Sequence, residues 1–131
     1  MILTKYALKN IKSEMRSNGI TGYIYLAPQG TSYPFCVFYP VSCSTSYTFS
    51  EIFENVIISM TIYSNNVDCE EVMDIAIELE NIFTGYENEE AGTTIICTHK
   101  VSENGPTYIE NSEYKWRLDM DFEFKCQRNK A

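Results

Sequence analysis

The chain has 131 residues, of which 44% are hydrophobic and 21% charged, and this composition excludes a largely disordered protein. Its 18 acidic residues exceed its 10 basic residues, so the formal net charge is −8. Such a charge argues against general binding to duplex DNA or to an anionic membrane surface, because both need clustered cations. No linker, repeat or low-complexity segment interrupts the chain, and we expect a single domain over residues 1–131.

The first expected element, in chain order, is a helix over residues 3–17. Its apolar residues recur at every fourth position between Leu3 and Met15, and Gly19 provides the C-terminal stop. Lysines interrupt the same segment, which argues against a signal peptide. Opposite the apolar face lies a basic stripe, formed by Lys5, Lys9, Lys12 and Arg16. Two interpretations stay open for the basic stripe: a solvated helix face, or a surface that docks onto an acidic neighbour such as a second copy of the chain.

Two strand-like segments follow this helix. Residues 20–26 alternate in character, with three apolar side chains expected on one side: Ile20, Ile24 and Leu26. A turn-rich connection over residues 27–32 leads into a second strand over residues 33–41. Pro40 cannot donate a ladder hydrogen bond, so we expect it at a strand end or edge.

The middle of the chain combines an ambiguous segment with two clearer elements. Ser42–Glu54 is rich in Ser and Thr, and we expect a strand end or a mobile arm there. Residues 55–64 alternate as a strand with one apolar face. A second helix is expected over Asp68–Phe83, where Asp68 would cap the first turn and Glu71 would complete a variant of the capping box.

The C-terminal part is predicted to add two strands. An acidic turn at Tyr86–Gly92 precedes a strand over Thr93–Val101, and Ser102–Ser112 is expected to be a loop because it contains the turn signal Asn104-Gly105-Pro106. The last strand, Lys115–Lys125, alternates strictly along its whole length. Its apolar side holds Trp116, Leu118, Met120, Phe122 and Phe124. Its charged side includes an acidic row, formed by Asp119, Asp121 and Glu123.

This order of elements predicts an α+β fold: a mostly antiparallel β-sheet with two α-helices packed on one face. Strands that are apolar on one side need a single covering layer, and two amphipathic helices can supply it. The acidic row would then lie on the uncovered face. It could bind a cation, line an acidic surface, or be solvated and paired with cross-strand Lys or Arg.

The sequence contains no recognisable catalytic, cofactor-binding or metal-binding motif, so we expect neither an enzyme nor a cofactor. The five cysteines are widely spaced, which favours reduced, buried thiols in a cytoplasm over a secreted disulfide framework. His99 is the single histidine, and it lies in a predicted strand in register with Ile95, Cys97 and Val101, as a structural sheet residue would. A ligand pocket would need convergent polar groups, and none is apparent.

Taken together, the elements resemble the tail-completion, or tail-terminator, family of tailed bacteriophages. The resemblance covers nearly the whole chain and rests on the order of its elements. These are an N-terminal helix, the strands of Ile20–Val41, a long strand at Asn55–Ser64, an acid-capped helix at Asp68–Phe83 and a closing strand at Tyr114–Cys126. Segments that match in kind are Ala27-Pro28 and Tyr33-Pro34-Phe35-Cys36-Val37-Phe38-Tyr39. Ser42–Glu54 departs from the family pattern, in which a more obvious loop is common.

The resemblance implies a structural role. Proteins of this family form rings, commonly hexameric, that cap the finished tail tube and help to join it to the head connector. The implied partners are other copies of the chain, the tail tube protein and the head connector or neck proteins. The implied location is the virion neck, after assembly in the host cytoplasm. DNA would pass through the ring lumen without specific binding, and the acidic row could line that lumen and repel the phosphate backbone.

Two alternatives stay open. A head-side connector or neck protein of the same virion would need the same kind of small scaffold. A cytosolic small-ligand-binding domain belongs to a different class, and it would use a pocket between the helices and the sheet.

Overall fold

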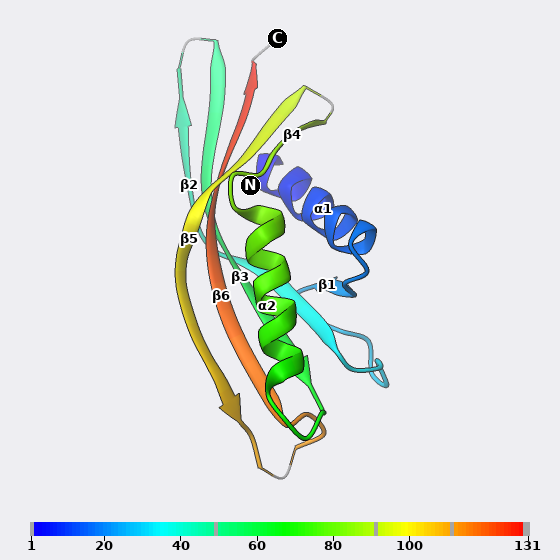
Figure 1. Cartoon of the computed structure of the whole chain (residues 1–131). Helices are drawn as coiled ribbons and strands as arrows, with labels where there is room; N and C mark the ends of the chain where they lie inside the picture. The colour runs from blue at the N-terminus through cyan, green and yellow to red at the C-terminus, as the bar shows by residue number, and fades with distance from the viewer. Residues whose placement is uncertain (1, 49, 91, 111, 130–131) are drawn as a thin grey trace.

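The computed structural model describes residues 2–48, 50–90, 92–110 and 112–129. Within these residues the chain forms one six-stranded sheet with two helices on the same face (Figure 1). The elements are α1 (Ile2–Ser17), β1 (Gly22–Ile24), β2 (Phe35–Tyr47), β3 (Glu51–Ser64), α2 (Glu70–Phe83), β4 (Glu87–Glu90), β5 (Thr93–Tyr108) and β6 (Trp116–Asn129). The strand order is β1-β2-β3-β6-β5-β4, with β1 parallel to β2 and every other pair antiparallel. The predicted α+β fold is confirmed.

The core lies between the helices and the sheet. Alternate residues of β6 enter it, and the rings of Phe122 and Phe124 lie 6.0 and 5.9 Å from the ring of Phe83 in α2. The predicted apolar face of α1 is also buried, from Leu3 to Met15. Burial of these side chains removes their apolar surface from water, which is the dominant favourable term in folding. The predicted amphipathic patterns of α1 and β6 are therefore confirmed.

The Ser- and Thr-rich segment belongs to a long β-hairpin. β2 continues to Tyr47 and β3 begins at Glu51, and the two strands pair along this segment. Of the two predicted alternatives, the strand end is therefore confirmed and the mobile arm is not. The hairpin extends beyond both helices at one end of the sheet (Figure 1). Pro40 lies at the edge of β2, as predicted, because β1 pairs only with Cys36–Phe38.

β5 is longer than predicted, because the expected loop at Ser102–Ser112 is a strand as far as Tyr108. Its pairing with β6 shifts register at three places: between Cys97 and His99, between Lys100 and Ser102, and between Asn104 and Thr107. Such bulges let a strand take up extra residues while it stays paired with its neighbour. The turn signal Asn104-Gly105-Pro106 therefore marks a bulge and not a loop.

The first of these shifts changes the direction of His99. The extra residue in β5 leaves His99 and Val101 exposed, whereas Ile95 and Cys97 are buried in the core. The prediction that these four residues share one face is wrong, since a single extra residue reverses the alternation of a strand.

The start of α2 also differs from the prediction. The N-cap residue is Cys69, which makes no side-chain cap hydrogen bond. The carboxylate of Asp68 accepts a hydrogen bond from the N–H of Glu70 at 3.1 Å, and that of Glu71 accepts one from the Ser64 hydroxyl at 2.6 Å. The predicted capping box is therefore wrong, because tertiary contact with the end of β3 engages the Glu71 side chain.

Two short strands complete the sheet edges. β1 is shorter than predicted because Tyr25, at φ 67°, turns the chain out of the strand. Leu26 is 82% exposed as a result, and the prediction that it shares a side with buried Ile20 is wrong. Part of the acidic turn predicted at Tyr86–Gly92 is β4, which pairs with the start of β5. Short terminal strands of this kind depend on their pairing partner more than on their own sequence.

A buried carboxylate joins the hairpin to α1. Glu54 of β3 is 2% exposed and accepts hydrogen bonds from the N–H of Thr4 at 3.0 Å and from its hydroxyl at 2.7 Å. The N–H of Thr4 belongs to the first turn of α1, where backbone donors lack helical partners. Burial on its own would raise the pKa of Glu54, but these hydrogen bonds hold it below its usual value.

Replacing Glu54 with glutamine is expected to destabilise the fold at neutral pH by about 1–3 kcal/mol, the usual effect of losing hydrogen bonds to a buried charged group. Because the folded pKa is depressed, this contribution is present above the pKa of the unfolded chain and is lost as the pH falls through the folded pKa. Urea unfolding between pH 7 and pH 3 should show the two proteins converging. A constant difference, or an equal effect of Glu89→Gln at an exposed site, would contradict this role.

Candidate functional site

The basic stripe lies on the outer face of α1. Lys5, Lys9 and Arg16 are exposed, and Lys12 is partly covered where α1 passes the segment Gly19–Tyr23. Within the part of the chain that the structure describes, none of the four side chains makes an ion pair. The stripe therefore remains available for a partner, and the structure leaves the choice between water and an acidic neighbour open.

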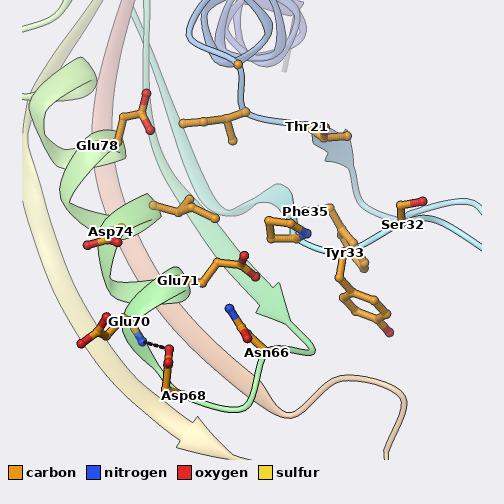
Figure 2. Close-up of a pocket in the computed structure, with 14 residues that line it drawn as sticks. Thr21, Ser32, Tyr33, Phe35, Asn66, Asp68, Glu70, Glu71, Asp74 and Glu78 are labelled. Carbon is orange, nitrogen blue, oxygen red and sulfur yellow. Dashed lines mark hydrogen bonds between the residues drawn. The ribbon is translucent and has the colours of Figure 1, made fainter.

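An acidic cleft opens beside α2 (Figure 2). Its volume is about 630 Å³, and Figure 2 shows the acidic side chains of α2 on one side and Thr21, Ser32 and Tyr33 across from them. The acidic residues are Asp68, Glu70, Glu71, Asp74 and Glu78. Apolar groups also line the cleft, among them Ile20, Ile75 and Pro34. Five acidic residues lining one cleft favour a cationic partner.

Sequence reasoning missed this cleft. The acids at 70, 74 and 78 recur every four residues, and this spacing predicts a common helix face. The wall across from them comes from the α1–β1 and β1–β2 connections, which no periodicity in the sequence places near α2. The expectation that no convergent polar groups exist is therefore wrong. Among the described residues, Glu70, Asp74 and Glu78 form no ion pair.

The sheet face away from the helices carries a cluster of aromatic rings, called here the aromatic face. Phe35 is at its centre, with ring centroids of Tyr33, Tyr63 and Tyr23 at 5.1, 5.3 and 6.1 Å. Two further contacts extend it, Tyr63 with Tyr114 at 4.7 Å and Tyr25 with Tyr39 at 5.8 Å. No described helix covers this face. Tyrosines that bury one side of the ring and leave the hydroxyl wet are typical of protein interfaces.

A hollow of about 380 Å³ adjoins the aromatic face. Ala27 lines one part of it, and Tyr33 and Phe35 line another. Leu26 borders the hollow and is 82% exposed, held there by the left-handed backbone of Tyr25 at φ 67°. A non-glycine residue in this region costs about 1–3 kcal/mol and is retained mainly where it serves a purpose. Here it presents an apolar side chain to solvent.

A second apolar patch lies at the other edge of the sheet, where α2 meets β5, and is called here the α2 patch. Met73 and Ile77 on α2 are 43% and 56% exposed. Ala76 and Pro106 line a shallow hollow beside Met73 and Ile77. The aromatic face and the α2 patch are different surfaces, at β1–β2 and at β5 respectively, so they lie near opposite edges of the strand order.

The acidic row lies on the uncovered face of β6, and its side chains are partly buried. Asp119 accepts a hydrogen bond from the hydroxyl of Thr61 at 2.7 Å and pairs with Arg117 at 3.2 Å. Asp121 accepts one from the Ser102 hydroxyl at 3.0 Å. The cross-strand partners of Asp119 and Asp121 are thus hydroxyl groups, and the basic partner of Asp119 lies on β6 itself, so the pairing with cross-strand Lys or Arg stays a prediction. The row and the basic stripe lie on opposite sides of the sheet and do not form one site.

The remaining candidates for chemistry are dispersed. All five cysteines are free, and burial raises the pKa of the Cys36, Cys97 and Cys126 thiols to about 12, so they are poor nucleophiles at neutral pH. Among the residues that the structure describes, no three His, Cys, Asp or Glu side chains are grouped so as to hold a metal ion. In the same residues no helix is long and apolar enough to cross a bilayer.

Comparison of the chain with protein-family models and with curated proteins returned no match. The function of the chain is therefore inferred from its own residues and geometry together with the family resemblance of its sequence.

Proposed function

We propose that this chain is a structural virion protein of the tail-completion type. It forms a homo-oligomeric ring, with six copies as the family resemblance implies, that caps the tail tube and joins it to the head connector in the virion neck. The observation that carries this proposal is the presence of two unlike apolar surfaces, the aromatic face and the α2 patch, near opposite edges of one sheet.

Unlike surfaces on one chain favour head-to-tail association. In a two-fold dimer each copy contributes the same patch, whereas contact between two different patches repeats from copy to copy and closes into a ring when the rotation allows. The aromatic face supplies flat rings around Phe35, and Leu26 stands out beside them. Met73 supplies a flexible thioether and Ile77 a branched aliphatic side chain, and both can pack on such rings. Each copy would cover the apolar surface that its neighbour exposes.

The projecting hairpin suits contact with a second ring. Beyond Pro40 the outer edge of β2 has no described strand beside it, so its backbone groups are available to another chain. Tyr47, 65% exposed, lies near the tip, and Val41, 52% exposed, lies near the base. An arm that reaches past the helices can touch the tail tube or the connector without taking part in closure of the ring.

The acidic character of the chain suits passage of DNA. Each copy has a formal net charge of −8, so a ring repels the phosphate backbone and DNA would slide through it without binding. The acidic row adds to this repulsion with the negative charge that remains after Asp119 pairs with Arg117.

The acidic cleft favours one second candidate, a binding domain for a small cationic ligand such as a polyamine. Such a domain would be monomeric and would bind its ligand saturably in the cleft. Light scattering during size-exclusion chromatography separates the two functions, because only the ring protein is expected to assemble as its concentration rises.

The tail-completion role predicts a specific activity on tail tubes. Purified chain added to polymerising tube protein of the same virion should stop elongation and appear as a cap at tube ends in negative-stain electron micrographs. Tubes that grow at the same rate with bare ends, in the presence of an assembled ring, would contradict the tail assignment while leaving the ring intact.

Leu26→Asp is expected to weaken assembly at least tenfold, because it places a charge in the apolar contact while the exposed side chain contributes little to folding. Ile96→Asp is the control, since Ile96 is also exposed, at 38%, but lies outside the aromatic face, the α2 patch and the acidic cleft. Sedimentation velocity over a range of concentrations measures both. Equal behaviour of the two variants would show that the aromatic face is not the contact.

A further inference from the structure

We propose that the basic stripe of α1 docks into the acidic cleft beside α2 of the next copy in the ring. This inference rests on the proposed head-to-tail assembly and names the charged contact that sets its direction. Its occupant is a second copy of this chain, because the chain itself carries a surface of matching charge and spacing.

The charges of the two surfaces are complementary and unsatisfied. On α1 the stripe places Lys5 and Lys9 four residues apart, and on α2 Asp74 and Glu78 have the same spacing. Like charges at this spacing on a helix repel one another. Within the described residues neither set makes an ion pair, so each helix keeps its self-repulsion in the single chain. A contact between the two helices relieves both.

The dimensions of the two surfaces also agree. With a rise of about 1.5 Å per residue, the stripe from Lys5 to Arg16 is about 16 Å long and the acidic run from Glu70 to Glu78 about 12 Å. The cleft combines acidic groups with apolar ones such as Ile75 and Pro34. Lysine and arginine suit this combination, because their methylene stems pack on apolar surface while the charged ends reach the carboxylates.

Within one chain, no ion pair joins the basic stripe to the acidic cleft among the described residues. The stripe is on the side of α1 opposite the buried residues Leu3, Ala7 and Ile11, and it therefore points away from the core on which both helices lie. The cleft is bounded on its own copy by residues that follow α1, from Gly19 to Thr21. Lys12 and Arg16 adjoin the same segment, whereas Lys5 and Lys9 line neither this cleft nor the hollow beside Lys12. Lys5 and Lys9 are therefore available to the cleft of another copy, and the opposite charges of the two surfaces disfavour contacts between like surfaces.

Two pairs of charge reversals test this contact. Lys5→Glu with Lys9→Glu gives a stripe variant, and Asp74→Lys with Glu78→Lys gives a cleft variant. All four side chains are exposed and outside the core, so both proteins should fold, as thermal unfolding can verify. Each variant by itself is expected to assemble at least tenfold more weakly than the wild-type chain, measured by native mass spectrometry over a range of concentrations.

Mixing the two variants gives the sharper result. The reversed stripe of one variant matches the reversed cleft of the other, and the unreversed surfaces match as well, so a one-to-one mixture should restore oligomers with equal numbers of both chains. Restoration that stops at two copies would contradict head-to-tail docking. Matched controls with the same changes in charge, Lys115→Glu with Lys125→Glu and Glu87→Lys with Glu89→Lys, are exposed elsewhere and should assemble normally.

The outcomes separate this inference from the proposed function. A wild-type chain that assembles, together with stripe and cleft variants that assemble equally well, overturns the docking inference and leaves the ring standing. A wild-type chain that never assembles overturns both. Saturable binding of spermine that is lost in the cleft variant, with assembly unchanged, would assign the cleft to a small cation instead.

Discussion

Phe122→Ala is expected to lower the free energy of unfolding by about 3–5 kcal/mol, the usual loss for deleting a fully buried aromatic ring. Phe122 is in the middle of β6 and packs on Phe83 from the helix layer. Removing its ring leaves a cavity at the junction of α2 and the sheet. Chemical unfolding of the dilute, monomeric chain measures the loss.

Phe35→Ala is the matched control on the other face of the same sheet. Phe35 is partly exposed, and its neighbours are the rings of the aromatic face. Its removal should cost the single chain only about 1–2 kcal/mol, from lost ring contacts, and should weaken assembly instead. Equal destabilisation by the two variants would mean that the aromatic face belongs to the core and does not serve as a contact surface.

Gly105→Ala is expected to destabilise the chain by about 2–4 kcal/mol. Gly105 has φ 111°, which favours glycine, and a Cβ atom at this position would lie 2.9 Å from the backbone oxygen of Arg117 and 3.2 Å from the backbone nitrogen of Thr107. Backbone atoms cannot move aside as a flexible side chain would, so the bulge between β5 and β6 has to open. Thermal or urea unfolding reports the change.

Gly30→Ala separates the cost of the left-handed backbone from the cost of the contact between the added Cβ atom and the neighbouring backbone. Gly30 also has a left-handed φ, of 81°, but a Cβ atom at this position would meet nothing within 4 Å. The substitution should cost only about 1 kcal/mol, from backbone strain in a turn. If Gly105→Ala were no worse than Gly30→Ala, the close approach of β5 to β6 at this bulge would be contradicted.

The elements that could be predicted are those whose side chains repeat with the period of their own backbone. β6 alternates without interruption, and α1 and α2 place apolar residues along one face, so their burial follows from spacing alone. The long hairpin and the full length of β5 could not be predicted. Each depends on pairing with a distant strand, and β5 keeps its pairing through bulges that break the alternation at His99 and Gly105.

Some of the candidate surfaces could be predicted from the sequence and others could not. The basic stripe follows from helical spacing and is exposed as expected, since all its members lie on one element. The acidic cleft forms where α2 meets the α1–β1 and β1–β2 connections, and the aromatic face forms where Phe35 and Tyr63 pair across β2 and β3. These residues can be assigned to their elements from the sequence. Their proximity cannot be predicted, because the contacts join elements that are far apart in the chain.

The central claim is that the chain closes into a ring by head-to-tail contact between unlike surfaces. Native mass spectrometry of the wild-type chain over a wide range of concentrations tests it most directly. The ring predicts a single closed species of more than two copies, six if the family resemblance holds, with few intermediates between it and the monomer. A chain that stays monomeric, stops at a dimer, or grows without limit would contradict the claim.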